Sequence, residues 1–500
     1  MHLMGIDVGS TGAKAVVFTP EGEIVGSAYR EYAEVYPRPG WIELVPGEVW
    51  DAVRFVIGEA AAQAGGGVRA LAISALGEAF TPVAKDGSFL YNTIVSPDAR
   101  ATKQAESWHQ TLGAERVFAI TGMPLHAGFT LNKLMWMRDE RPDIHARTWK
   151  YLLWPDTILF KLGLPPRIDH SLAGRTMAFD VTRREWSAEM LEVAGIPAEM
   201  LAEPIAPGEV VGELSAQAAA EVGLEAGCLV VAGGHDQPMN ALGAGVIREG
   251  MCVDGMGTVE CITVAFDRPV LTEAMRTHNY GCYPHVVTPM YATIAYNYSA
   301  GSILRWWRDQ FGSEERRVAN ERGVDVYDVL LADLPEGPSG LLWLPYFAGS
   351  GTPYLDPRAK GAILGLALDT DRPRLVKALL EGTCFEIDLN VRALEKAGVP
   401  IDRLRATGGG SRSDAWLQLK ADITGKPVVR LNISESGCQA GAMLGGAALG
   451  VWRDLAEATA ALVREGEGFE PRPEMQERYA SLRACYAEFW PAIRNIAHRL

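Results

Sequence analysis

A glycine-rich turn close to the start of the chain carries the residue types that bind phosphate. The segment reads Asp7-x-Gly9-Ser10-Thr11-Gly12-x-Lys14. Its two glycines let backbone N–H groups approach an anion without a Cβ in the way, and its hydroxyls and lysine add donors and a positive charge. The aspartate at the strand end could hold Mg²⁺ through waters. An ordinary β-turn with a solvated lysine has the same pattern, so the turn alone leaves both interpretations open.

A second carboxylate follows a short apolar strand near the middle of the chain. The strand expected at Leu229–Ala232 ends in a glycine-marked turn, Gly233-Gly234-His235-Asp236-Gln237-Pro238, before a helix of small residues at 239–245. Open α/β sheets bind ligands at the carboxyl ends of their strands, where Asp236 could accept a proton from an attacking hydroxyl. A helix N-cap is the other interpretation of this aspartate. We expect His235 to be structural, because no second metal ligand lies at a suitable spacing.

Three further segments rich in small residues lie in the second half. They are Gly255-Met256-Gly257-Thr258, Thr407-Gly408-Gly409-Gly410-Ser411-Arg412-Ser413-Asp414, and the helix start Glu435–Ala442. The first repeats the phosphate-type turn. In the second, consecutive glycines permit the flat approach of a nucleotide, and the helix N-terminus that follows favours anions. A plain loop capped by Ser413 or Asp414 is the alternative there, and close helix packing is the interpretation of the third segment.

Alternating strands and helices must position these segments. The expected strands are 3–8, 15–18, 24–26, 68–74, 229–232 and 403–406, and the expected helices are 48–64, 375–394, 414–423, 439–449 and 475–499. Such alternation indicates α/β domains. The strand–turn–strand pattern at 6–18 recurs at 253–266, which suggests two related halves. We place the boundary near 245–252, giving domains 1–247 and 248–500.

The order of these motifs over nearly the whole chain resembles the FGGY family of carbohydrate kinases. The family's N-terminal signature fits Gly128-x-Thr130-x-x-Lys133-Leu134-x-Trp136-Met137-x-Asp139-Glu140 throughout, and its C-terminal signature is recognisable from Gly361 to Glu381. The chain departs from the C-terminal pattern at Arg374 and Leu379, both on an expected packing helix. Further stretches similar to the family are Pro39–Glu43, Asp98-x-Arg100 and Gly349–Tyr354.

The resemblance implies a fold, an activity and a set of site residues. Two actin-like domains of ribonuclease-H type, an α/β fold, would hold ATP and a sugar in the cleft between them. Asp236 would be the general base, Asp7 and Asp236 would organise Mg²⁺, and Glu78, Asp236 and Gln237 would hold substrate hydroxyls. The nucleotide-side positions that match the family are Thr11, Lys14, Gly257, Thr258, Gly301, Arg305, Gly408, Gly409, Gly410 and Ser413.

The composition excludes several other classes of protein. The 500 residues include 47 Lys+Arg and 62 Asp+Glu, a net charge of −15, which argues against non-specific binding to nucleic acid or anionic membranes. No run of about 18 apolar residues predicts a membrane span, and the N-terminus enters a strand-like pattern that leaves no room for a signal peptide. Seven cysteines without metal-type spacing favour the cytoplasm. Members of the family are often dimers, so a homodimer is considered, although the sequence shows no interface.

A ketose or polyol of about five or six carbons is the predicted acceptor. Glycerol kinases carry Arg beside the substrate Glu, where this chain has Gly77, and many relatives have Trp where it has Ser96. Both changes remove bulk and predict a roomier pocket. The Gly-His-Asp-Gln motif also differs from the Gly-Asp-Asn form usual in D-xylulose kinases. A glycerol- or xylulose-type kinase and a non-catalytic actin-like ATP-binding protein are the alternatives, whereas a dinucleotide-binding oxidoreductase is disfavoured because no GxGxxG follows the first strand.

Overall fold

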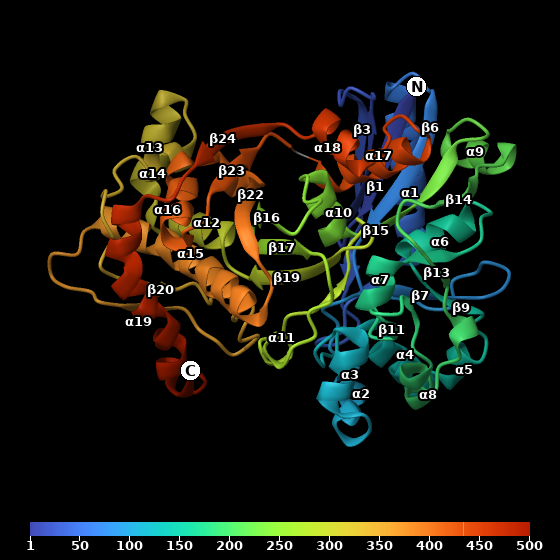
Figure 1. Ribbon diagram of the computed structural model, residues 1–500, viewed down its shortest axis with the longest axis horizontal. Helices are drawn as coiled ribbons and strands as arrows, with labels where there is room; N and C mark the ends of the chain where they lie inside the picture. Colours follow the sequence, from blue (N-terminus) through green and yellow to red (C-terminus); the bar gives the residue numbers. More distant parts are fainter. Residues whose placement is uncertain (434) are drawn as a thin grey trace.

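The computed structural model describes residues 1–433 and 435–500, which form two α/β halves side by side (Figure 1). The first half is built on a six-stranded sheet of order β14-β15-β6-β1-β2-β3. Its strands are β1 (His2–Val8), β2 (Gly12–Phe18), β3 (Ile24–Glu31), β6 (Val68–Ala75), β14 (Val210–Glu213) and β15 (Leu229–His235). β1, β2 and β3 are joined antiparallel, whereas β1, β6 and β15 run parallel. The nearly continuous apolar runs in the parallel strands fit burial on both faces of the sheet.

The second half repeats this arrangement in a seven-stranded sheet of order β18-β19-β17-β16-β22-β23-β24. Its strands are β16 (Gly250–Met256), β17 (Glu260–Phe266), β18 (Tyr283–Pro284), β19 (Tyr291–Asn297), β22 (Ile401–Thr407), β23 (Val428–Leu431) and β24 (Glu465–Phe469). Here β16, β17 and β19 are antiparallel, and β16, β22 and β23 run parallel. The recurrence of 6–18 at 253–266 thus corresponds to two hairpins, β1–β2 and β16–β17, at the same place in sheets of the same topology.

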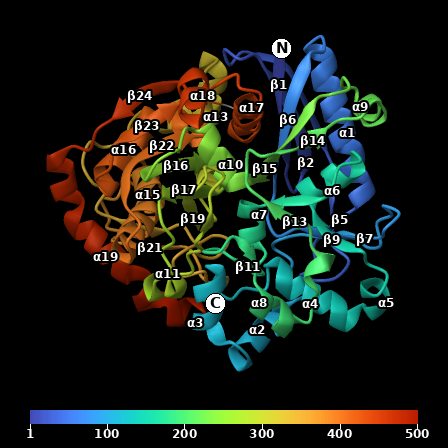
Figure 2. The same ribbon diagram turned by 45° about the vertical axis from the view of Figure 1, so that its right-hand side comes forward.

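Helix α17 (Ser436–Ala448) crosses between the halves. It packs against β1, β6 and α10 (Asp236–Gly243) of the first half, although it lies far along the chain from them. Figures 1 and 2 both show the red α17 beside the blue β1. The small residues of α17 permit this close contact, which confirms the packing interpretation of the segment after Glu435. The division of the chain at 247/248 stays a prediction.

The other helices cover the sheets from outside. α1 (Pro46–Gln63) packs on β2 and β3, and the second half carries α15 (Arg372–Ala397), α16 (Asp414–Thr424) and α19 (Pro473–Ala497). The five helices expected from the sequence are confirmed to within three residues at each end. Among the described residues, no helix combines the length and the apolar character that crossing a membrane requires.

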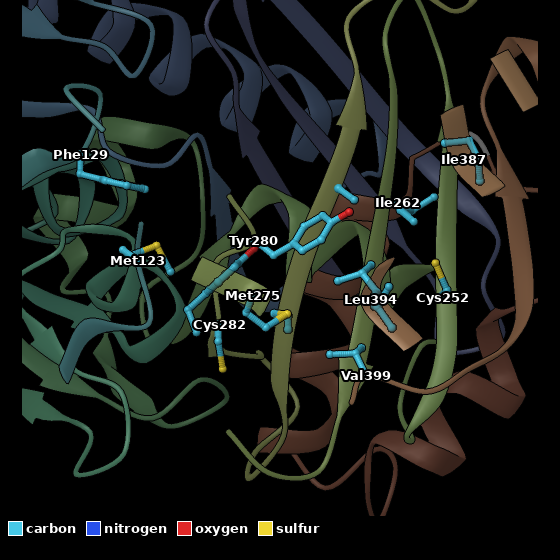
Figure 3. Packing of buried hydrophobic residues seen from close by; sticks show 14 of the residues in the cluster. Met123, Phe129, Cys252, Ile262, Met275, Tyr280, Cys282, Ile387, Leu394 and Val399 are labelled. Carbon is cyan, nitrogen blue, oxygen red and sulfur yellow. The ribbon is translucent and has the colours of Figure 1, made fainter. Parts of the chain in front are cut away.

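One hydrophobic cluster connects the two halves. Figure 3 shows its side chains running from Met123 and Phe129 in the first half, past Tyr280 and Cys282, to Ile387 on α15. Met123 and Phe129 belong to the segment between β6 and β14, which also carries the short helices α4 (Thr130–Glu140) and α7 (His170–Arg175). This segment supplies residues to the site described next.

Candidate active site

The first hairpin places Asp7 at the carboxyl end of β1. Its Oδ1 accepts a hydrogen bond from Ser74 Oγ at 2.6 Å. Burial raises the pKa of Asp7, although the Ser74 hydrogen bond works in the opposite direction. The turn that follows is closed by the N–H of Gly9, which donates to Gly12 O at 2.9 Å, and by the Tyr32 hydroxyl, 2.6 Å from Gly9 O. The turn is therefore held by its own backbone hydrogen bond and by Tyr32, the residue that follows β3.

Lys14 lies in β2, and its side chain contacts a residue from the second half of the chain. Its Nζ lies 2.9 and 2.8 Å from the two carboxylate oxygens of Glu435, just before α17, and 5.6 Å from the centre of the Tyr29 ring. Burial works to lower the pKa of Lys14, but the hydrogen bonds to Glu435 raise it overall. The next residue, Ser436, bonds Asn240 of α10 at 2.8 Å. A Cβ built on Gly437 would lie 3.4 Å from Asp7 Oδ1, so the start of α17 lies against Asp7.

Asp236 is the first residue of α10 and stands at the carboxyl end of β15. Its Oδ1 is buried without a hydrogen-bond partner among the described residues, and the N-cap position of α10 is held by His235, so Asp236 is not the N-cap. Burial raises the pKa of Asp236 to about 7, and the nearby charges of Asp7 and Glu78 add to the shift. Nε2 of His235 lies 3.1 Å from this Oδ1, but burial holds the pKa of His235 far below its usual range, so the imidazole is neutral.

The expected turn at Gly233-Gly234 is wrong. β15 continues through both glycines to His235, and α10 begins directly at Asp236 rather than at Met239. The glycines serve close approach within the sheet, because a Cβ on Gly233 would lie 2.0 Å from Ile73 O of β6. Two consecutive glycines predict a turn from the sequence alone, because the sequence does not show how near the neighbouring strand passes. As a result, the carboxylate follows the strand without a loop.

Glu78 is held beside Asp236 by an arginine from another element. Arg175, the last residue of α7, donates from Nε to Glu78 Oε1 at 2.5 Å and also pairs with it through Nη2. Glu78 has a φ of 59°, an unusual conformation for a residue with a side chain, and the Thr130 hydroxyl donates to its backbone O at 3.1 Å. The room expected at Gly77 is filled, because a Cβ there would lie 2.8 Å from the His235 ring.

The nucleotide-side residues lie around the β16–β17 turn. Thr258 is 3.4 Å from a guanidinium nitrogen of Arg305, and the N–H of Gly301, at the start of α12 (Gly301–Phe311), donates to Gly257 O at 3.0 Å. A cavity of about 890 Å³ is lined by residues that include Gly257, Thr258, Gly301, Arg305, Gly409, Gly410 and Ser413. A second cavity of about 760 Å³ is lined by residues of both halves, among them Gln237, Asn240, Gly257, Thr258, Gly408, Gly409 and Ser436. The two cavities share the Gly257–Thr258 turn.

Ser413 has the capping role considered as an alternative. Its Oγ accepts from the N–H of Trp416 at 3.3 Å and so caps α16. The hydroxyl proton is left free to donate, and the same residue lines the larger cavity. Capping and ligand binding are therefore compatible at this position.

A buried ion triad supports the β16–β17 hairpin from within. Lys420 of α16 pairs with Asp254 and Glu260, and all three side chains are fully buried. Burial raises the pKa of Glu260 to about 7, although the charge of Lys420 opposes the shift. The triad ties the phosphate-type turn to the helix that Ser413 caps.

The structure brings together most of the residues predicted for the site. Asp7, Glu78 and Asp236 share one electrostatic environment, and the glycine-rich turns of the second half adjoin the same interdomain cavity. Sequence reasoning missed Arg175, Tyr32 and the contact of Glu435 with Lys14. Each of these contacts joins two residues that are 23 to 421 positions apart in the chain. No local sequence pattern predicts such a pairing.

Comparison with known proteins decides the family. Residues 2–243 match the N-terminal domain, and residues 255–451 the C-terminal domain, of the FGGY family of carbohydrate kinases. The chain belongs to this family. Among FGGY relatives, a xylulose kinase of Bacillus subtilis is 25% identical over 99% of this chain and 98% of its own length. A gluconokinase of the same species is 29% identical over 89% of this chain and 87% of its own length.

Solved structures agree with the FGGY assignment. A crystal structure of xylulose kinase from Rhodospirillum rubrum superposes with a TM-score of 0.89 at 28% identity, covering all of both chains. The predicted α/β fold of two actin-like domains is thus confirmed, and so is the activity class. The protein is an ATP-dependent carbohydrate kinase, a phosphotransferase with an alcohol group as acceptor.

Proposed function

We propose that this FGGY kinase transfers the γ-phosphoryl group of ATP to a hydroxyl of a ketose or polyol of about five or six carbons, with Asp236 as general base. The observation that carries the assignment is the Oδ1 of Asp236, which is buried and unpartnered among the described residues and lies at the carboxyl end of β15. A sugar hydroxyl has a pKa far above 7, so its proton is best taken as the new bond forms. A carboxylate whose pKa is raised to about 7 is a stronger base than an ordinary aspartate and is still about half ionised at neutral pH.

Positioning and charge neutralisation supply the rest of the catalysis. The transition state of phosphoryl transfer is loose, with negative charge spread over the γ-phosphoryl oxygens. The turn at 257–258 lines both cavities, and Arg305 presents a positive charge to the larger one. We infer that the turn at 9–12 and Lys14 add backbone N–H groups and a further positive charge from the first half. We assign Thr11, Lys14, Gly257 and Thr258 to the phosphates. Gly301, Arg305, Gly408–Gly410 and Ser413 are assigned to the nucleotide.

Mg²⁺ fits the donors at the end of β1. Asp7 has one carboxylate oxygen bonded to Ser74 and keeps the other for a cation, and Asp236 adds a second carboxylate, so together they offer a hard cation oxygen donors. The described residues contain no group of three or more His, Cys, Asp or Glu side chains suited to a metal, and a nucleotide-bound Mg²⁺ needs only one or two carboxylates. When bound, Mg²⁺ would neutralise phosphate charge.

The proposed acceptor size draws on the relatives and on Ser96. Xylulose has five carbons and gluconate six, and the relatives named for them match nearly the whole chain. The test is a coupled assay of ADP release with Mg-ATP over sugars and polyols from three to seven carbons, with Asp236→Asn as the control. Activity on glycerol alone would overturn the acceptor assignment. ATP binding without transfer to any acceptor would favour the non-catalytic alternative.

The free cysteines and the family resemblance bear on the compartment and the assembly of the protein. All seven cysteines are unpaired, which supports a reducing compartment such as the cytoplasm. We keep a homodimer as a proposal from the family resemblance. Light scattering coupled to size-exclusion chromatography would test it, and a mass of one chain at micromolar concentration would overturn it.

A further inference from the structure

Arg175 is partly exposed and has hydrogen-bond donors that its ion pair with Glu78 does not use. Nε and Nη2 contact the same oxygen of Glu78, Oε1, and Nη1 has only the Met123 sulfur, a weak acceptor, at 3.8 Å. Its side chain is 18% exposed. Within the described residues, no hydrogen bond uses the other oxygen of Glu78, Oε2. Glu78 therefore has a free acceptor, and Arg175 has free donors beside it.

The guanidinium of Arg175 is held rigidly in this place. It lies 5.3 Å from the centre of the Phe129 ring and 5.2 Å from the centre of the Tyr283 ring. Phe129 precedes α4 in the first half, whereas Tyr283 begins β18 in the second half. A cation clamped by aromatic rings from both halves is pre-oriented and loses little freedom when it binds.

Glu78 and Arg175 lie close to Asp236, the proposed general base. The charges of Glu78 and Arg175 act in opposite directions on the pKa of Asp236, which places both within electrostatic reach of the base. Residue 77 is a glycine and contributes no side chain to the space beside Glu78, and the His235 ring lies where a side chain at 77 would begin. An acceptor whose hydroxyl reaches Asp236 would therefore present its neighbouring hydroxyls to Glu78 and Arg175.

The charges at this place disfavour an anionic acceptor. Asp7, Glu78 and Asp236 are carboxylates, and the one guanidinium among them is already paired with Glu78. Lys133 is nearby, but it is fully buried, donates to Val95 O at 2.9 Å, and has a pKa lowered by burial to about 7. A carboxylate on the acceptor would meet a net negative surrounding, which acts as selection against it.

We propose that Glu78 and Arg175 form one recognition pair for two adjacent hydroxyls of the acceptor, and that the pair selects uncharged sugars and polyols over aldonates. Glu78 Oε2 accepts from one hydroxyl, and Arg175 Nη1 donates to the oxygen of the next. The inference rests on the proposed function, and it adds to it a residue of α7 and the charge class of the acceptor.

Kinetics with deoxy analogues test the pair. The wild type, Arg175→Met and Arg175→Lys are compared on the best acceptor of the screen and on analogues that each lack one hydroxyl. Loss of a hydrogen bond to a charged group predicts that Arg175→Met raises the acceptor KM about 10- to 100-fold and leaves the KM for ATP unchanged. Arg175→Lys recovers part of the loss. On the analogue that lacks the hydroxyl bound by Nη1, wild type and Arg175→Met differ less than about threefold, because the partner is already absent.

Controls separate recognition from folding. Arg116→Met removes an arginine that pairs with Glu189 on the surface, and it leaves every constant unchanged. Arg175→Met/Glu78→Gln removes the charge left unpaired on Glu78 and is used if the single variant fails to fold. A loss that is equal on all analogues, in both the single and the double variant, would show a purely structural role and overturn the inference.

The selection against anionic acceptors is tested separately, by comparing kcat/KM for aldonates and for uncharged acceptors. The wild type is expected to use aldonates at least 100-fold less well than the matching uncharged acceptors in kcat/KM, and Glu78→Gln narrows the gap at least tenfold. A wild type that prefers aldonates would overturn the inference. If no acceptor is phosphorylated, the proposed function fails, and thermal-shift titration of the same acceptors without ATP still tests the pair. Binding of none of them, or equal binding of aldonates, would overturn the inference as well.

Discussion

Lys14 and Glu435 form an ion pair that joins the first hairpin to the segment before α17. The Nζ–Oε2 distance is 2.8 Å, and the two residues are 421 positions apart in the chain. Both side chains are partly exposed. The lysine assigned to the phosphates is thus engaged by a carboxylate. Phosphate binding must compete with Glu435 for the same ammonium group.

Removing Lys14 is expected to weaken ATP binding, whereas removing the charge of Glu435 is expected to strengthen it. Lys14→Met should weaken Mg-ATP binding about 10-fold or more, because a charge-assisted contact is lost. Glu435→Gln should tighten it a few-fold, because the ammonium group no longer has a competing carboxylate. Titration calorimetry with a non-hydrolysable ATP analogue measures both, and Glu189→Gln serves as a surface control. Weaker binding in Glu435→Gln would show instead that Glu435 itself supports the nucleotide.

Asp236→Asn is expected to lower kcat about 10²- to 10⁴-fold, the usual contribution of a positioned general base. The amide keeps the size of the side chain but accepts no proton at neutral pH. KM for ATP should change less than kcat, since most of the nucleotide-side residues lie in the second half. Steady-state kinetics decide the matter, with the exposed Asp51→Asn as the matched control. Full activity in Asp236→Asn would exclude this residue as the base.

The pH dependence of the reaction should follow the same carboxylate. Because the pKa of Asp236 is raised to about 7, the group is largely protonated at pH 6 and cannot accept a proton there. We therefore expect kcat/KM for the acceptor to rise with pH, to reach half its limit near pH 7 and to level off about one pH unit higher, with a limiting slope of one on the acid side. The residual activity of Asp236→Asn should lack this rise. A wild-type profile that is flat from pH 5.5 to 8 would contradict the assignment.

Sequence reasoning succeeded where the determinants are local. The Asp7 turn, the second-half turn at Gly257 and the helices follow from glycine placement and periodicity within a few residues. It failed at Gly233 because the reason for that glycine is the carbonyl of Ile73 in a neighbouring strand. It also missed Arg175, whose partner Glu78 lies 97 positions earlier. Both depend on which segments the fold brings side by side, and the sequence has no local signal for that.

Gly5→Ala tests the close contact between β1 and α17. A Cβ at this position would lie 1.8 Å from the carbonyl O of Cys438, and backbone on both sides leaves no flexible side chain to yield. We expect a loss of about 3 kcal/mol in the free energy of unfolding, at the upper end of typical overpacking costs. Gly47→Ala is the control, because its Cβ meets open space on the exposed start of α1, and it should be neutral or slightly stabilising. Urea unfolding measures both, and equal stability of the two variants would contradict the contact.

Lys420→Met tests the buried triad. Without the ammonium group, Asp254 and Glu260 are two buried carboxylates with no counter-charge, and breaking such a pair costs about 3–5 kcal/mol. The loss should depend on pH. The pKa of Glu260 is already raised from 4.5 to about 7, chiefly by burial, and Lys420 opposes the shift, so its removal raises the pKa further. A carboxyl group whose pKa is higher in the folded than in the unfolded protein is destabilising once it is ionised. The free energy of unfolding therefore falls as the pH rises toward and past the folded-state pKa. Lys420→Met should therefore be much closer to wild type at pH 5 than at pH 8.

Lys426→Met is the matched control for this experiment, because Lys426 pairs with Glu395 at the surface, where an ion pair is worth at most about 1 kcal/mol. Its effect should be small at both pH values. Urea unfolding of the three proteins at pH 5 and pH 8 separates the cases. A loss in Lys420→Met that is the same at both pH values would mean that packing of the lysine stem, rather than its charge, holds the β16–β17 turn in place. Since that turn carries Gly257 and Thr258, a pH-dependent loss should be accompanied by weaker ATP binding at pH 8 than at pH 5, relative to wild type.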